Sequence, residues 1–143
     1  MFQLRFRVVL HYYLVENGGV SMPLVHVIAR RENAVLHSDA AIAEVVQWLR
    51  VRIAQELSCA DPGGQLTAQD IEVEVVDRDP KRHFGGDEFD LQVVVYAGEY
   101  PDRRANLEER RRGLQTGLAA VFGSRNVHGY VWILPIAGSF GAF

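Results

Sequence analysis

Apolar residues along this chain follow two alternating periods, one typical of strands and one of helices. Residues 24–29 form a short apolar run, and residues 71–76 alternate Ile or Val with Glu as a half-buried strand does. Between them, apolar residues recur at steps of three and four, and Ser38 stands where it would cap a helix. These apolar positions are Ile42, Val45, Val46, Leu49, Ile53 and Leu57. The pattern predicts a strand at 24–29, a helix at 38–57 and a strand at 71–76.

The same order of elements returns in the second half of the chain. Residues 91–97 include three consecutive valines and a tyrosine, which favour a strand. Asn106 and Glu109 resemble a capping box that opens a helix, and Gly123 follows the last apolar residue of that helix. A final strand is predicted at 129–134, followed by a Gly-rich tail at 135–143.

Each half therefore predicts a β-α-β unit, in which the helix provides the crossover that two parallel strands require. Two such units predict an α+β fold with a four-stranded mixed sheet and both helices on one face. Strands 24–29 and 91–97 are apolar on both of their faces, so the other face of the sheet also needs a cover. Association of several subunits through that face is the expected solution.

Composition narrows the functional classes. The chain has 143 residues, 48% of them hydrophobic, which suits one globular domain. A net charge of -3 excludes a general affinity for nucleic acid, and the single Cys59 excludes an intrachain disulfide. The apolar run at 6–15 is shorter than the roughly 20 residues that span a bilayer. We expect a cytoplasmic protein with neither nucleic acid nor membrane as a partner.

The start of the predicted domain resembles the tautomerase superfamily, whose members begin Met-Pro, continue with a strand and contain one or two β-α-β units. Met22 and Pro23 precede strand 24–29 in this way. Counting from Pro23 leaves 121 residues, 143 minus 22, which is similar to double-unit members such as macrophage migration inhibitory factor and 5-carboxymethyl-2-hydroxymuconate isomerase. The segments at 75–77 with 84–86, 102–107 and 130–132 support the resemblance. It implies a tautomerase-like domain at 23–143 preceded by an extension at 1–22.

The resemblance implies that the amine of Pro23 is the catalytic base. A free α-amine has a pKa of about 7.7–8.0, which an apolar pocket would lower. Such an amine can take a proton alpha to the carbonyl of a small 2-oxo or enol acid and return it elsewhere, which makes the protein an isomerase. The residues do not distinguish this reaction from decarboxylation or hydration. The resemblance also implies a bacterial homotrimer that needs no cofactor and no metal.

Acidic substrates require cations, and arginine binds a carboxylate with two parallel hydrogen bonds. Arg31 and Arg103 follow the first strand of each unit and are the candidates. Tyr130 and Trp132 alternate on the last strand, so they point the same way and are candidates to line the pocket. A structural or solvated role for the arginines, and packing for the two aromatic residues, are equally compatible with the pattern. His26, within the first strand, is expected to be a core histidine.

Catalysis requires that Pro23 be the first residue, because an internal prolyl nitrogen is a tertiary amide without basicity. The codons of Gly18 and Gly19 are compatible with a purine-rich ribosome-binding site ahead of Met22, which favours residues 1–22 as mis-assigned upstream sequence. Alternating apolar residues at Phe2, Leu4 and Phe6 favour the opposite, a real added strand. In that case the alternative function is a non-enzymatic oligomeric binding or scaffold protein.

Overall fold

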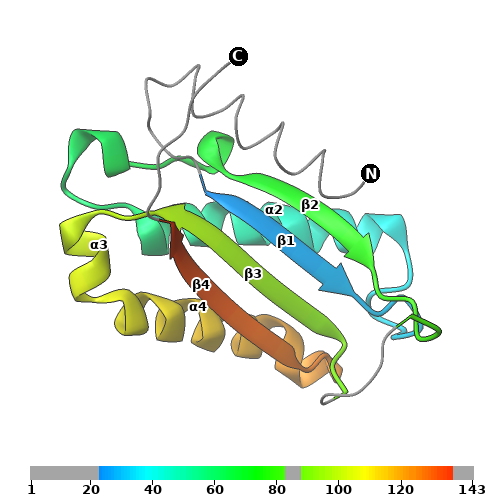
Figure 1. Cartoon of the computed structure of the whole chain (residues 1–143). Helices are drawn as coiled ribbons and strands as arrows, with labels where there is room; N and C mark the ends of the chain where they lie inside the picture. The colour runs from blue at the N-terminus through cyan, green and yellow to red at the C-terminus, as the bar shows by residue number, and fades with distance from the viewer. Residues whose placement is uncertain (1–22, 83–87, 137–143) are drawn as a thin grey trace.

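The computed structural model of the chain describes residues 23–82 and 88–136, and its main elements follow the two predicted units (Figure 1). The first unit consists of β1 (Leu24–Ala29), α2 (Asp39–Leu57) and β2 (Glu72–Asp77). The second consists of β3 (Leu91–Gly98), α4 (Leu107–Phe122) and β4 (Gly129–Ile136). The predicted α+β class is confirmed, and each of these elements begins and ends within two residues of its prediction.

The four strands form one mixed sheet in the order β2-β1-β3-β4. The strands of each unit are parallel, whereas β1 and β3 are antiparallel, with Leu24 opposite Tyr96 and Ala29 opposite Leu91. Both long helices lie on the same side of the sheet (Figure 1). The antiparallel centre means that the two units run in opposite directions.

The core lies between the sheet and the two helices, and it uses every second residue of each strand. Val25 and Val27 of β1 and Val93 and Val95 of β3 are buried there, since alternate strand residues share a face. The helices contribute the stripe of apolar residues that their spacing predicts: Ile42, Val45, Leu49, Ile53, Leu57, Leu114 and Phe122. The spacing of the apolar residues therefore determines which face of each strand and of each helix is buried in the core.

The predicted N-terminal cap is confirmed for helix α2 and is wrong for helix α4. The Oγ of Ser38 accepts a hydrogen bond from the Ala41 amide at 3.1 Å, which confirms the predicted cap of α2. The capping box at Asn106 is wrong, because the Asn106 Oδ1 accepts instead from the Arg110 Nε at 2.5 Å. A short helix α3 (Pro101–Ala105), which the sequence pattern did not predict, leads into α4.

Three 3-10 turns complete the described elements, namely η1 (Pro62–Gly64), η2 (Ala68–Asp70) and η3 (Gly123–Arg125). The extension at 1–22, the segment 84–86 that supports the resemblance and most of the tail lie outside the described residues. Within the described part of the chain, no helix has the length and apolar character to cross a membrane.

Candidate functional site

Pro23 stands directly before the central strand β1 and is fully buried. Its carbonyl accepts a hydrogen bond from the Glu72 amide at 3.2 Å, so the residue is held at the start of the sheet. Leu24 is opposite Tyr96, so Pro23 lies beside Ala97, at the end of β3. Pro23 shares the helix-covered side with Val25, because the two residues are two positions apart in the chain.

Arg103 lies at this same end of the sheet and is only 2% exposed. Its Nε donates to the Leu57 carbonyl at 2.9 Å, Nη1 to the Gly98 carbonyl at 2.7 Å and Nη2 to the Gly64 carbonyl at 3.4 Å. Burial lowers the pKa of the guanidinium below its ordinary value. The side chain thereby joins the end of α2, turn η1 and the end of β3.

The ring of Tyr100 covers the Arg103 guanidinium, whose central carbon lies 4.9 Å from the ring centroid. The Tyr100 hydroxyl donates to the Gly63 carbonyl at 2.9 Å, which fixes the ring against η1. Arg103 is therefore enclosed by backbone carbonyls and an aromatic face. That environment holds a cation at the Pro23 end of the sheet.

Arg31 lies at the other end of β1. Its Nη2 is 2.6 Å from an Asp39 carboxylate oxygen and its Nη1 is 3.2 Å from an Asp77 oxygen. Its Nε and Nη2 both donate to the His37 carbonyl, at 3.2 and 3.0 Å. The hydrogen bond with Asp39, more than any other cause, raises the pKa of Arg31. Arg31 thus ties the start of α2 to the end of β2.

The separation of the two arginines follows from the sheet topology. Arg31 and Arg103 each follow the first strand of a unit, but β1 and β3 are antiparallel, so the two loops emerge at opposite ends. The six-residue β1 alone spans about 17 Å. Within one subunit, Pro23 and Arg103 share an end of the sheet, and Arg31 does not join them.

Tyr130 and Trp132 lie on edge strand β4, on the face of the sheet away from the helices. Together with Leu134 they are the most exposed large hydrophobic residues of this strand, at 42%, 52% and 38% exposure respectively. The Tyr130 ring meets that of Phe89 edge to face, with 6.0 Å between centroids. One strand therefore presents an apolar row to solvent.

The register extends this open face across the whole sheet, because Trp132 is opposite Val94, Val94 opposite His26 and His26 opposite Glu74. His26 is half-buried on the open face and not in the core, so its prediction as a core histidine is wrong. Because Val25 and Val27 belong to the core, strict alternation places His26 opposite to them. The alternation of His26 with two valines in the sequence was therefore enough to place it on the face opposite the core.

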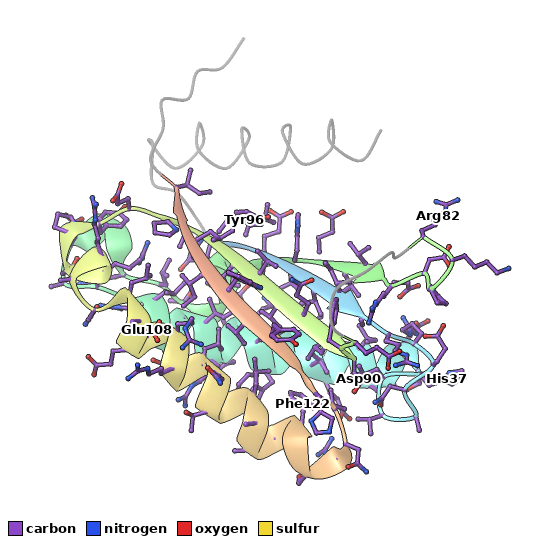
Figure 2. All side chains as sticks on the ribbon, turned by 60° about the horizontal axis from the view of Figure 1, so that its bottom comes forward. His37, Arg82, Asp90, Tyr96, Glu108 and Phe122 are labelled. Atoms are coloured by element: carbon purple, nitrogen blue, oxygen red, sulfur yellow. The ribbon has the colours of Figure 1, made fainter. Side chains whose placement is uncertain are left out.

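Four titratable side chains lie near one another on the open face. The His26 Nε2 is 3.5 Å from a Glu74 carboxylate oxygen, and the His26 ring contacts that of Tyr96, with 5.4 Å between centroids. Burial lowers the pKa of His26, while Glu74 raises it in part. Burial, with a smaller contribution from Glu74, raises the pKa of Glu72. Figure 2 shows Tyr96 on the side of the sheet opposite the helices.

No family model matches the sequence, and no curated protein does. Among the solved structures that resemble the fold is the crystal structure of native Ps01740. It is 14% identical, superposes with a TM-score of 0.53, and the match covers 84% of this chain and 99% of that one. This likeness shows a shared small α+β fold.

Proposed function

We propose that the chain is a subunit of a tautomerase-superfamily isomerase that acts on a small 2-oxo or enol acid. The observation that carries the proposal is the position of Pro23, directly before the central strand of a sheet built from two β-α-β units. This is the position that the sequence resemblance implies for a catalytic proline.

The chemistry requires Pro23 to carry a free amine, as it would after removal of Met22. Burial disfavours the charged form of an amine, and so does a nearby cation such as Arg103. The neutral secondary amine takes the proton alpha to the substrate carbonyl, and the resulting ammonium returns it to another carbon or to oxygen. General base and general acid are then the same atom.

Substrate binding is proposed to need more than one subunit. Arg103 already donates to three carbonyls, and Arg31 lies at the far end of β1 from Pro23. In a homotrimer, Arg31 of one subunit would serve Pro23 of another by exchanging part of its contacts with Asp39 and Asp77 for the substrate carboxylate. Tyr130 and Trp132 would line the shared pocket. The exposed apolar row of β4 supports association through the open face.

The first experiment is N-terminal sequencing of the protein from its native host, followed by an enol-ketone assay with phenylenolpyruvate. We expect a chain that begins at Pro23 and is active. Pro23→Ala should lower the rate at least about 100-fold, since acid-base groups contribute factors of that order. Pro80→Ala, in the exposed turn after β2, is the matched control and should keep full activity. A native chain that begins at Met1 and lacks activity would contradict the proposal.

The second candidate is a non-enzymatic oligomeric binding or scaffold protein. The engagement of every Arg103 nitrogen by a carbonyl favours it, because this arginine already has a purely structural role. It predicts that an oligomer forms and that chains beginning at Met1 and at Pro23 are equally inactive on enol acids. Sedimentation and the same assay on both forms decide between the candidates.

A further inference from the structure

A cavity of about 220 Å³ lies between the last turns of α4 and the starts of β3 and β4. Its walls are apolar and come from elements far apart in the sequence: Leu91, Val93, Leu118, Phe122, Val127 and Val131. Gln115 and His128, both exposed, stand at the same cavity and bring polar groups to its mouth. Figure 2 shows Phe122 at the end of α4 and Asp90 before β3, at the same end of the molecule.

The turn that closes one side of this cavity is fixed by hydrogen bonds. The Val127 amide donates to the Phe122 carbonyl at 3.2 Å, and the Asn126 amide donates to the Gly123 carbonyl at 3.2 Å. Asn126 adopts a left-handed conformation with φ of 59°, and its carbonyl accepts from the Asn33 side chain at 3.1 Å. The turn is therefore anchored to the loop before α2.

The strand side of the cavity is equally constrained. The His128 amide donates to an Asp90 carboxylate oxygen at 3.1 Å, and its carbonyl accepts from the Leu91 amide at 3.2 Å. A Cβ added to Gly129 would come within 1.7 Å of the Leu91 carbonyl oxygen, so only glycine fits where β4 starts beside β3. Hydrogen bonds thus hold both the turn and the strands in place around the cavity.

We propose that this cavity binds a small aromatic molecule of one or two fused rings with at most one polar group. An apolar cavity of about 150 Å³ stays dry and takes benzene, so about 220 Å³ has room for a ring system such as indole. An N–H or O–H of the ligand meets His128 or the Oε1 of Gln115, which also accepts from the Arg111 guanidinium. A carboxylate is disfavoured, because apolar walls give its charge no partner.

Within one subunit this cavity lies apart from Pro23, although Tyr130, which the proposed function places in the shared pocket, also lines it. The cavity contains the first residues of β3, whereas Pro23 lies beside Ala97 at its other end. Six strand steps, from Leu91 to Ala97, correspond to about 20 Å. Binding in the cavity therefore needs no free N-terminal amine.

The test is a titration of the full chain with indole, followed by NMR of the valine and leucine methyl groups. We expect saturable one-to-one binding, with the largest shift changes at Val93, Leu118 and Val131. No saturation up to the solubility limit of indole would overturn the proposal. So would shift changes centred on Leu134 and Val94 of the open face.

Two adjacent alanines on α4 provide a matched pair of variants. Ala119 lines the cavity and Ala120 does not, although both are exposed. Ala119→Trp should place its own ring over the cavity and weaken indole binding at least tenfold, while Ala120→Trp should leave the affinity unchanged. Equal affinity in both variants would overturn the site. Because both side chains start exposed, neither change disturbs the core.

The variant Pro23→Ala separates the test of the cavity from the test of the proposed function. Pro23→Ala should leave the affinity for indole unchanged, whatever it does to tautomerase activity. If the chain binds indole and has no isomerase activity, the cavity proposal stands and the proline mechanism fails. If binding is lost in Pro23→Ala, the two sites are one and the separate cavity site is overturned.

Discussion

Trp48 of α2 packs against Gly117 of α4 so closely that a Cβ on Gly117 would lie 3.0 Å from two carbons of the indole ring. One turn earlier on α4, a Cβ on Gly113 would come within 2.6 Å of the Glu56 carboxylate. Two glycines four residues apart thus let the two helices approach. The Trp48 ring also meets Phe122 edge to face, with 6.0 Å between centroids.

Gly117→Val should therefore destabilise the protein by about 1–3 kcal/mol, the range for an overpacked contact. Urea unfolding followed by circular dichroism measures the change. Gly123→Ala is the control, because nothing lies within 4 Å of its Cβ position and its φ of -59° suits alanine. That change should raise stability by about 0.4–1 kcal/mol. Equal effects of the two variants would contradict the packing argument.

Arg103→Met should lower the free energy of unfolding by at least about 2 kcal/mol, because three carbonyl oxygens would lose a buried donor. Arg104→Ala is the neighbouring control. Arg104 forms an ion pair with Glu99 at 2.7 Å, but its side chain is 73% exposed, so its loss should change stability by less than about 1 kcal/mol. Denaturant midpoints of the two variants measure how much stability each has lost. Similar losses in both would contradict the structural role of Arg103 in joining α2, η1 and β3.

Glu108 should titrate far below an ordinary glutamate. Two hydrogen bonds from Arg111, at 2.8 and 2.9 Å, and one from Arg112 lower its pKa to about 2 from 4.5. Because the folded pKa is the lower one, this carboxylate favours the folded state above about pH 4.5, and the contribution is lost as the pH falls toward 2. Carboxyl NMR should show the low pKa, and changing both arginines to Gln should restore it toward 4.5. An unshifted Glu108 in the native chain would contradict the contacts.

The pKa of His26 should lie below 6.5, since burial disfavours its charged form. Below pH 6.5 the unfolded chain takes up the proton first, so the folded state should lose stability as the pH falls further. Glu74→Gln should lower this pKa further, because it removes the charge that favours the imidazolium. NMR of the imidazole protons measures the shift, with Glu44→Gln on α2 as a distant control. A higher pKa of His26 in Glu74→Gln would contradict this prediction.

Trp132→Glu should dissociate the proposed homotrimer. The side chain is 52% exposed on β4, so a charge there should leave the folded subunit intact and disfavour burial of the open face. Sedimentation measures the assembly, and circular dichroism verifies the fold. Glu109→Lys, on the outer part of α4, is the charge-changing control and should keep the assembly. A trimer that survives in Trp132→Glu would place the interface elsewhere.

The sequence predicts the two units of this fold well, because each long element buries a stripe of apolar residues with a clear period. Helix α2 and its Ser38 cap are examples. The short helix Pro101–Ala105 is too brief to show a period, and only Pro101 at its start signals it. Asn106 fails as a cap because its side chain bonds to an arginine one turn later, a competition that spacing alone does not reveal.

The candidate site is less predictable, because it depends on strand direction. Sequence similarity between the two halves suggests that Arg31 and Arg103 are equivalent, but antiparallel pairing of β1 and β3 sends them to opposite ends. The burial of Arg103 comes from carbonyls of residues 57 and 64, which are distant in the sequence. The cavity beside α4 likewise arises from elements that meet only in the fold.

Strand order also brings the two ends of the described chain together. Leu24 of β1 and Leu134 of β4 are both opposite Tyr96, so only β3 separates them. Two strand spacings amount to about 10 Å. The last residues of β4 therefore lie at the same end of the sheet as Pro23. A substitution at Leu134 or Ile136 would thus alter the surroundings of the proposed catalytic residue, so tests of Pro23 are best done with both left unchanged.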